Sequence, residues 1–504
     1  MCSHPGHRFC RRPLSTHAAS AAPTGVTRRR LLEGAALATF LGSLGGSAAS
    51  TLITPSQAQG APGRILLKNG MILSMDRQVG DLRGDVLIEN GRIAQVGPNI
   101  TVADAQVIDA TNRIVMPGFI DTHRHMWEGV IRNSLPNGSL FEYLQVVLGK
   151  IGPVYRPEDV YAGNLISAIS AMDAGITTIL DWSHIQNTPE HTDAAIKGLQ
   201  ESGIRAVFGY GSPQLGWGKK LSDSTAHRYP QDLRRLKTQY FASNDGLVTL
   251  ALAANGPGFG SVDAAVDEWK LARDVGVRIS VHASAGQGGS HPFEMLANRG
   301  VFGPDTTYIH CSALTDTEWK MIADTGGTVS LAPVVEMAMG MGVSTQAALA
   351  AGLRPSLSID VETTVPNDLF SQMRAAFTQQ RDEIFARVRK GEKELASKRL
   401  NARDVLEFAT IEGARANGME ARTGSLTPGK QADVILLRTD AINVMPVTDP
   451  VAAVVLGMDT SNVDTVIIGG QIKKRDGKLV GIDMARVADL AQKSHDYIVK
   501  TSGI

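Results

Sequence analysis

The feature that most constrains this chain is a regular alternation of short apolar segments with helix-compatible ones between residues 118 and 417. Eight apolar segments have the length of buried strands, and each is followed by sequence typical of a helix, such as Pro157 to Ala174. The eight predicted strands are Phe119–His123, Thr177–Asp181, Ala206–Gly209, Val248–Ala251, Ile279–His282, Thr307–His310, Thr328–Leu331 and Ser356–Asp360. Because strands that alternate with helices pair in parallel, this order predicts an α/β fold whose sheet closes as a (β/α)8, TIM-like barrel.

The sequences on both sides of this region have the pattern of short β-strands joined by tight turns. Asn-Gly pairs at residues 69–70 and 90–91 favour the tight turns that close hairpins. The same pattern of short apolar segments and turn residues occurs again after Ala432, with Gly-Gly at 469–470 and Asp-Gly at 476–477. We therefore predict a barrel over residues 118–417. We predict that residues 59–117 and 418–504 together form a small β-sandwich domain, the second segment ending in a helix.

The first 58 residues differ in kind from the rest. Arg28 and Arg29 precede an apolar run of small residues from Gly34 to Ala49 that contains no acid. This pattern resembles a twin-arginine signal peptide, with Glu33 where lysine is commoner and a cleavage site after Ala58. It predicts the twin-arginine export machinery as a partner and a periplasmic or secreted mature chain. The run is too short and too rich in Gly and Ser for a stable membrane anchor; a disordered basic leader is the alternative.

Charge and cysteine content exclude several classes of protein. Lys plus Arg and Asp plus Glu both total 50, so no basic footprint for nucleic acid is present. Two of the three cysteines lie in the leader, which leaves Cys311 and no intrachain disulfide after cleavage. The sequence does not define the oligomeric state, and a homo-oligomer stays open.

Histidines and one acid stand at the carboxyl ends of the predicted strands, which in such a barrel surround the catalytic mouth. The residues are His123, His125, His282, His310 and Asp360. On an extended strand alternate side chains share a face, so His123 and His125 point the same way. Neutral imidazoles with a carboxylate suit one divalent cation, zinc first, with iron or manganese as alternatives.

Three segments give the chain a specific resemblance. Pro117–His125, Ile309–Cys311 and Gly424–Asp433 resemble the amidohydrolase superfamily, in the branch that contains cytosine deaminase and the triazine hydrolases. The resemblance implies that His123, His125, His282 and Asp360 hold a single metal. It also implies that His310 contacts the bound water or the substrate. Superfamily members with two metals carry a lysine at the end of strand four, whereas Leu250–Asn255 has none.

The chemistry of such a site predicts a function. A bound dication makes hydroxide available near neutral pH, and Asp360 can accept and return the proton while His310 stabilises developing negative charge. We therefore expect a metal-dependent hydrolase of carbon–nitrogen bonds, either an amide or a ring amine, in a small substrate, heterocycles included.

One position departs from the pattern. Deaminases of this branch usually carry a glutamate three residues after the strand-five histidine, where this chain has Ala285. Glu336 is a candidate replacement as a catalytic acid, with a solvated loop glutamate as the equal alternative, and Glu128 is more typical of a structural residue. If neither serves, Asp360 alone favours an esterase, lactonase or dehalogenating hydrolase. A non-catalytic binding protein is a third hypothesis, although no metal ligand is missing.

Further residues are expected to border the mouth. His184 and Trp182 follow the second predicted strand and are candidates for substrate contact, Trp182 by stacking on a planar ring. Core or rim packing is the alternative for Trp182 and for Trp217, and His291 is expected to be only a loop residue. Methionines at 337, 339 and 341 suggest an adaptable apolar loop over the site.

Overall fold

The computed structural model describes residues 63–504 apart from 217–218, 220–226, 285–289 and 393–397. The predicted signal peptide, Trp217 and Ala285 lie outside the described residues. None of the helices that the structure describes is both long and apolar enough to cross a membrane.

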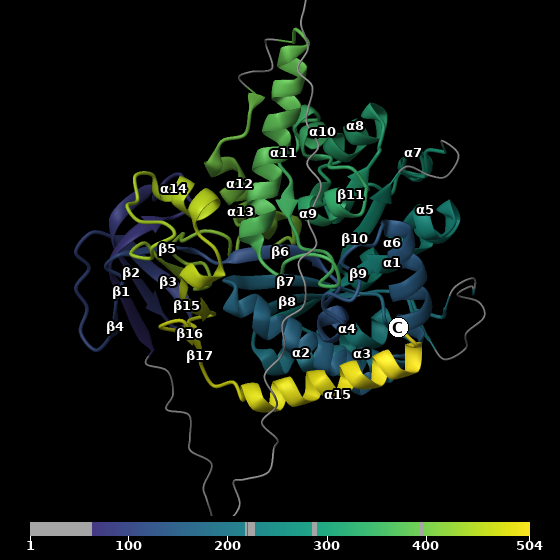
Figure 1. The fold of residues 1–504 in the computed structure, drawn as a ribbon, viewed down its shortest axis with the longest axis horizontal. Coiled ribbons are helices and arrows are strands. Elements are labelled where there is room, and N and C mark those ends of the chain that lie inside the picture. The colour runs from purple at the N-terminus through teal and green to yellow at the C-terminus, as the bar shows by residue number, and fades with distance from the viewer. Residues whose placement is uncertain (1–62, 217–218, 220–226, 285–289, 393–397) are drawn as a thin grey trace, which may run out of the picture. The chain divides into compact units, whose positions relative to one another are not determined.

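Eight parallel strands form the barrel in chain order, as the sequence predicted (Figure 1). They are β6 (Phe119–Arg124), β7 (Ile176–Ser183), β8 (Arg205–Tyr210), β9 (Val248–Ala254), β10 (Arg278–Ser284), β11 (Thr306–Ser312), β12 (Thr328–Leu331) and β13 (Ser356–Leu357). The first and last strands meet at Asp360, whose backbone N–H donates to the His123 carbonyl at 2.9 Å and whose carbonyl accepts from the His125 N–H at 2.9 Å. The ring of strands is thus closed at the residues that were expected to bind metal.

Helices cover the outside of the barrel. They include α2 (Pro157–Asp173), α3 (Pro189–Ser202), α4 (Leu233–Gln239), α6 (Val262–Val275), α7 (Pro292–Ala297), α8 (Asp316–Asp324), α9 (Pro333–Ala338), α10 (Thr345–Ala350), α11 (Leu369–Arg389), α12 (Ala402–Phe408) and α13 (Ile411–Ala416). The caps of α6 show how the sequence sets its limits. The Ser261 hydroxyl accepts from the Ala264 N–H, and Gly276 takes a left-handed conformation at the other end.

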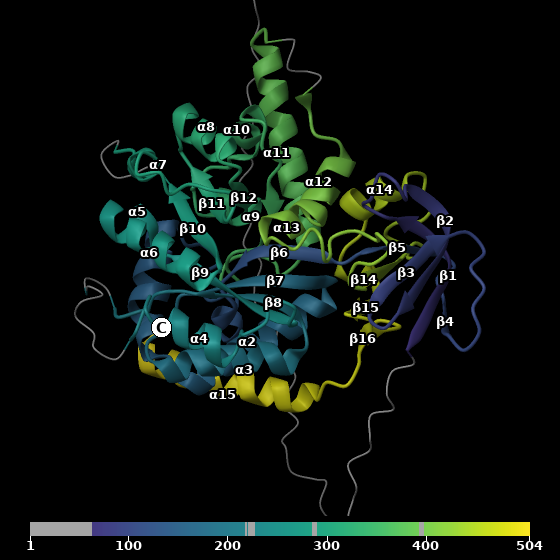
Figure 2. The same ribbon diagram turned by 180° about the vertical axis from the view of Figure 1, so that it is seen from behind.

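The two flanks form one nine-stranded mixed sheet beside the barrel (Figure 2). Its strands are β1 (Arg64–Leu73), β2 (Asp81–Glu89), β3 (Arg92–Gly97), β4 (Gln106–Asp109), β5 (Arg113–Pro117), β14 (Val434–Arg438), β15 (Val463–Ile468), β16 (Gln471–Arg475) and β17 (Lys478–Leu479). Antiparallel pairing of β5 with β14 joins the two flanks, and the sheet has a hydrophobic core of its own. The short helix α14 (Pro450–Ala452) lies between β14 and β15 in the chain. The last helix, α15 (Met484–Ser502), packs against α2 on the barrel. The barrel with an appended β domain is therefore confirmed.

Asp433, the last residue of the segment Gly424–Asp433 that carries the family resemblance, has a structural role. Its carboxylate binds the Arg205 guanidinium on β8 through two contacts of 2.6 and 3.0 Å, and it accepts from the Gly469 N–H at 2.7 Å. All three groups are buried or nearly so, and the pair ties the β domain to the barrel.

Three local predictions were wrong. Asn69-Gly70 does not close a hairpin but lies inside β1, where Asn69 has a φ of 67° and the register with β2 shifts. The last barrel strand ends at Leu357 rather than Asp360, because Asp360 has a φ of 72° and cannot continue a strand. The sequence from Phe370 to Arg399 is typical of one long charged helix, but α11 ends at Arg389 and is followed by Gly391 at a φ of 108°.

Candidate metal centre

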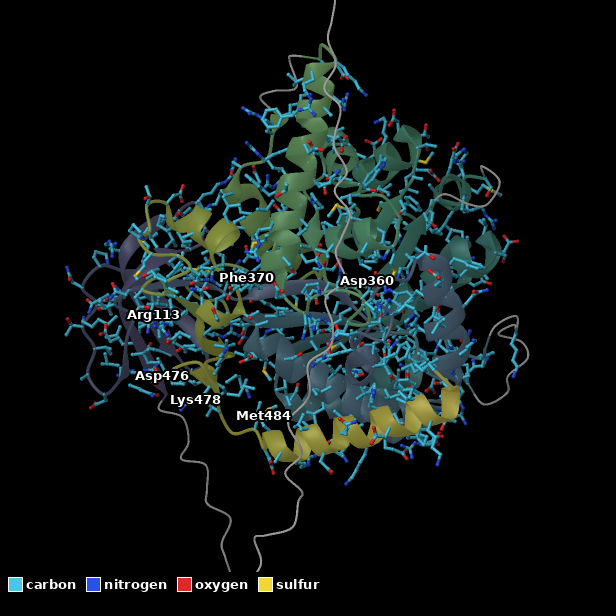
Figure 3. All side chains as sticks on the ribbon, viewed as in Figure 1. Arg113, Asp360, Phe370, Asp476, Lys478 and Met484 are labelled. Carbon is cyan, nitrogen blue, oxygen red and sulfur yellow. The ribbon has the colours of Figure 1, made fainter. Side chains whose placement is uncertain are left out.

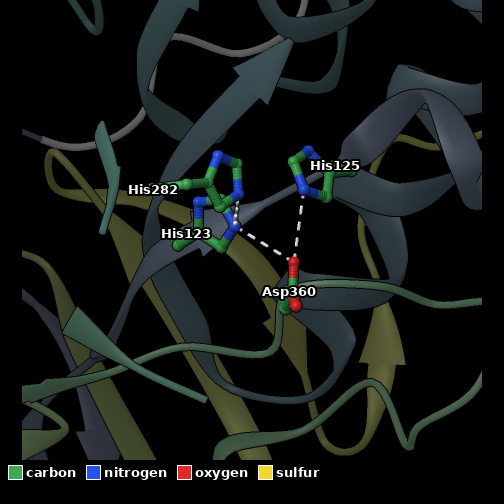
Figure 4. Close-up of side chains that lie close together, drawn as sticks. All are labelled: His123, His125, His282 and Asp360. Carbon is green, nitrogen blue, oxygen red and sulfur yellow. Dashed lines mark hydrogen bonds and ion pairs between the residues drawn. The ribbon is translucent and has the colours of Figure 1, made fainter. Parts of the chain in front are cut away.

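Four of the predicted residues converge at the carboxyl end of the barrel (Figure 4). One potential ligand atom from each of His123, His125, His282 and Asp360 lies within 4.8 Å of all the others. Asp360 Oδ1 is 3.0 Å from His123 Nε2 and 3.2 Å from His125 Nε2. His282 Nε2 is 3.2 Å from His123 Nε2. Asp360 itself lies within the barrel, where Figure 3 labels it.

The chemistry of this donor set fits a divalent cation. The separations of 3.0 Å between Asp360 and His123, 3.2 Å between Asp360 and His125, and 3.2 Å between His282 and His123 are close to the roughly 3.3 Å that separates ligands of a tetrahedral zinc with bonds of about 2.0–2.1 Å. Two nitrogen lone pairs facing each other at 3.2 Å repel unless a proton or a cation lies between them. A single proton cannot satisfy three imidazoles, whereas one cation can.

Charge states agree with ligation. Burial lowers the pKa of His123 to about 3, even though the neighbouring Asp360 pulls it upward. Burial and the adjacent imidazoles hold the pKa of His282 well below its ordinary value. Burial alone would raise the pKa of Asp360, but the surrounding histidines outweigh it and hold the pKa well below the usual range. His123 and His282 are therefore neutral and Asp360 is ionised. Burial alone would lower the pKa of His125, but its hydrogen bond to Asp360 and the charge of that carboxylate outweigh burial and raise it.

His125 is held in the tautomer that a ligand needs. Its Nδ1 lies 2.7 Å from the Trp182 carbonyl oxygen, which can only accept a hydrogen bond. Nδ1 therefore carries a hydrogen, and Nε2, 3.2 Å from Asp360 Oδ1, is the ring nitrogen left to bind a cation.

A buried ion-pair network supports the junction of β6 with the Asp360 loop. The Arg124 guanidinium lies between the two histidines in sequence but points away from them, donating to Asp121 Oδ2 at 2.7 Å and to Glu362 Oε1 at 3.2 Å. Asp121 Oδ1 in turn accepts from the His123 and Ile359 N–H groups at 3.3 and 3.1 Å. Residues on both sides of the site are thereby held by one cluster.

His310 and Glu336 form a pair next to the four residues. His310 Nε2 is 3.5 Å from Asp360 Oδ2, and its Nδ1 is 3.0 Å from Glu336 Oε1. Glu336 Oε1 also accepts from the Ala332 N–H at 2.8 Å. The two carboxylates outweigh the effect of burial on His310 and raise its pKa. Glu336 is fully buried and is not among the described residues that line the cavity, so it reaches the site through His310.

A cavity of about 540 Å³ opens above the centre. Asp360, His125, His282 and His310 form its floor, and His184 and Trp182 line its wall. Trp182 packs its ring against His282, with centroids 4.2 Å apart. Met339 and Met341 line the cavity, while Met337 is 48% exposed. His291 is not among the described residues that line the cavity, and its Nδ1 is 3.8 Å from Glu318 Oε2.

Two residues at the site were not singled out from the sequence. Trp127 lies in η1 (Met126–Val130), and its indole N–H donates to His184 Nδ1 at 3.2 Å. Tyr143 ends the short helix α1 (Leu140–Tyr143) and lines the cavity, and its hydroxyl donates to Glu128 Oε1 at 2.6 Å. Their only sequence signal is their closeness to the histidine pair, because the contacts depend on how irregular segments fold back over the barrel.

The comparisons with known proteins agree with this fold and site. A family model described as the amidohydrolase family matches residues 114–473. The 5'-deoxyadenosine deaminase of Methanosarcina mazei is 28% identical over 447 residues, which cover 86% of this chain and 98% of that protein.

Two solved structures share the fold. An adenosine deaminase from Xanthomonas campestris with bound zinc has a TM-score of 0.74 at 21% identity and covers 87% of this chain and 99% of its own. An atrazine chlorohydrolase from Arthrobacter aurescens, complexed with zinc and atraton, has a TM-score of 0.75 at 22% identity, covering 86% and 100%.

The barrel and its convergent histidines thus define a metal-dependent hydrolase, and the chain belongs to the amidohydrolase family. It is an amidohydrolase-type enzyme that acts on carbon–nitrogen bonds other than peptide bonds.

Proposed function

We propose that this chain removes an amino group from a small heterocycle by hydrolysis, with one zinc ion held by His123, His125, His282 and Asp360. The observation that carries the proposal is the convergence of these four side chains on the floor of a cavity large enough for one or two fused rings. The relative from Methanosarcina mazei is a 5'-deoxyadenosine deaminase, and two structural neighbours, an adenosine deaminase and an atrazine chlorohydrolase, contain zinc.

The cation would supply a nucleophile, because it lowers the pKa of water toward neutrality. Asp360, which is ionised, would accept a proton from that water as its oxygen attacks the ring carbon. The carbon–nitrogen bond then breaks, and the leaving amine takes a proton to depart as ammonia. In the overall reaction, an amino-heterocycle and water give a hydroxy- or oxo-heterocycle and ammonia.

His310 and Glu336 take the place of the glutamate that is usual at position 285. Glu336 accepts from His310 Nδ1, which orients the ring and stabilises its protonated form. The Nε2–H of His310 then faces the substrate beside Asp360 and can donate to the ring or to the departing amine. In this mechanism Glu336 is a positioning residue and His310 carries the proton.

A second candidate function rests on Ala285 itself. Without the usual glutamate, a substrate whose leaving group needs no proton, such as an ester, lactone or halide, would react by the same attack. The Glu336→Gln variant separates the two functions. We expect kcat for an amine substrate to fall about 100-fold, with little change for an ester. Equal losses on both substrates, or none, would remove the proposed role of Glu336.

The experiment that tests the proposed function is a substrate panel on the metal-loaded enzyme. The panel contains 5'-deoxyadenosine, adenosine, cytosine, atrazine, simple amides and aryl esters, and ammonia release is measured before and after chelation. Chelator-sensitive release of ammonia from at least one amino-heterocycle supports the proposal. A protein that carries zinc but hydrolyses only esters or halides would favour the second candidate, and one inert on all of them would favour a binding protein.

We also propose that the enzyme is exported in folded form by the twin-arginine route and works in the periplasm or outside the cell. The supporting observation is Arg28-Arg29 ahead of the apolar run in the leader. The Arg28→Lys, Arg29→Lys double variant is expected to stay in the cytoplasm with its leader attached, as fractionation and immunoblotting would show. Unchanged export would contradict this proposal and leave the catalytic one untouched.

A further inference from the structure

The environment of His184 fixes which of its ring nitrogens carries a hydrogen. The indole N–H of Trp127 can only donate, and it lies 3.2 Å from His184 Nδ1. Nδ1 must therefore present its lone pair to Trp127. An imidazole with a lone pair on Nδ1 is neutral and carries its hydrogen on Nε2.

The His184 ring lies in the same cavity as the proposed metal ligands. His184 lines the cavity and is 6% exposed, whereas Trp127 is fully buried and is not among the described lining residues. The His184 ring stacks on that of His125, with centroids 4.0 Å apart at 26°. Its backbone carbonyl accepts from Gln214 Nε2 at 2.8 Å, which holds the segment in place. The His184 ring is thus fixed on both its edge and its face, next to a proposed metal ligand.

We propose that the Nε2–H of His184 is a fixed hydrogen-bond donor that selects substrates with a lone pair, a ring nitrogen or a carbonyl oxygen, close to the carbon that is hydrolysed. Trp127 is the positioning residue that keeps this nitrogen a donor. A substrate that presents an N–H at the same point is rejected, because two donors then face each other unsatisfied. The inference rests on the proposed function for its substrate, but the tautomer can be measured without it.

The rest of the cavity narrows the class of substrate. Its apolar lining residues include Leu140, Leu144, Leu148, Phe259, Met339 and Met341. Among the described lining residues, Lys219 is the single cation and Asp360 the single carboxylate. The geometry therefore favours a flat ring that accepts one hydrogen bond near the reacting carbon and carries an apolar substituent.

The tautomer is tested by NMR on zinc-loaded mature protein labelled with 15N-histidine. Long-range 1H–15N spectra report the protonation of each ring nitrogen, and the His184→Gln variant assigns the signal. We expect His184 at neutral pH to be protonated on Nε2 alone, and to become a mixture of tautomers in Trp127→Phe. The control is Trp269→Phe, which removes an indole hydrogen bond of the same 3.2 Å length, to Thr306, away from the cavity. A wild-type His184 protonated on Nδ1, or unaltered by Trp127→Phe, would overturn the inference.

Selectivity is tested by the binding of benzimidazole and indole, which have the same shape and differ by one ring lone pair. Calorimetry on the zinc-loaded enzyme measures the ratio of their affinities, and any contact with the metal is common to all variants. We expect His184→Leu to reduce the preference for benzimidazole about tenfold, as the loss of one neutral hydrogen bond predicts. His184→Gln, which keeps a donor nitrogen, should stay within about threefold of wild type, and so should the control His291→Leu.

Two outcomes separate this inference from the proposed function. An unchanged preference in a folded, zinc-containing His184→Leu protein would overturn the role of His184, whatever the enzyme hydrolyses. If His184→Leu does not fold, the comparison of Trp127→Phe with Trp269→Phe decides instead. Failure of the proposed function would show as absent ammonia release in the wild type, with the NMR and binding results standing on their own.

Discussion

Glu128 is a buried acid three residues after His125 that the mechanism does not use. One of its carboxylate oxygens accepts from the Tyr143 hydroxyl, and the other has no hydrogen-bond partner among the described residues. Burial raises its pKa from 4.5 to about 8. The sequence favoured a structural role for this residue, and its contacts agree with one.

This raised pKa predicts a pH-dependent stability. Between about pH 4.5 and about pH 8 the folded chain holds the proton on Glu128 and the unfolded chain does not. Protonated Glu128 therefore makes its full contribution to the free energy of unfolding below pH 4.5, and this contribution is lost as the pH rises to about 8. We expect Glu128→Gln, which is uncharged at every pH, to unfold with a free energy roughly 2–4 kcal/mol above wild type at pH 8.5 and similar to it near pH 4.5. Urea unfolding at both pH values measures this, and a difference independent of pH would contradict it.

At single positions, sequence reasoning predicted which histidines and acid lie together at the barrel mouth but missed their hydrogen-bond partners. His123, His125, His282, His310 and Asp360 were predictable because each stands at a strand end, where the fold dictates the direction of the side chain. The pairing of His310 with Glu336 and of His184 with Trp127 was not, since each partner comes from a separate helix or loop. Glu336 could equally have been a solvated loop residue, and only packing distinguishes the two.

Among the elements, the junction of β6 with the loop after β13 contributes most to the site. The barrel strands were predictable because short apolar segments alternate regularly with helix-compatible ones. The end of β13 was not, because the left-handed conformation of Asp360 follows from its contacts with β6 and has no local signal. The Asn69-Gly70 pair shows the converse, since a strong turn signal is overridden by pairing on both sides of β1.

The Arg124 cluster at this junction is expected to be the most sensitive point of the barrel. Arg124→Met removes the cation that Asp121 and Glu362 share and leaves Glu362 paired with Arg132 alone. We expect a loss of about 3–5 kcal/mol in unfolding free energy and a zinc affinity lowered about 10–100-fold, because both backbone supports of the site shift.

The matched control is Arg113→Met on β5, a residue labelled in Figure 3. Arg113 also binds two acids, Asp464 at 3.2 Å and Asp440 at 3.5 Å, but its side chain is 20% exposed and lies in the β domain. The Arg113→Met variant should lose no more than about 1 kcal/mol of unfolding free energy and keep its zinc affinity unchanged. Denaturation and competitive zinc titration check both variants, and equal effects would contradict the structural role assigned to the Arg124 cluster.

For the whole molecule, the metal is expected to contribute to stability as well as to catalysis. The four proposed ligands come from β6, β10 and the end of the barrel, so a cation that binds them joins segments far apart in the sequence. Zinc at about 1,000 times its dissociation constant stabilises the folded state by about 4 kcal/mol. We expect chelation to lower the melting temperature by several degrees, zinc to restore it, and His282→Ala to show neither change in differential scanning calorimetry. A melting temperature indifferent to chelation would contradict this expectation.

The central claim is that one cation is bound by three imidazoles and one carboxylate at the mouth of the barrel. The most direct test is an anomalous difference map from crystals of the zinc-loaded enzyme, recorded on both sides of the zinc absorption edge. We predict a single peak about 2.0–2.2 Å from Nε2 of His123, His125 and His282 and from a carboxylate oxygen of Asp360. No peak there, or a peak bound by other residues, would contradict the account.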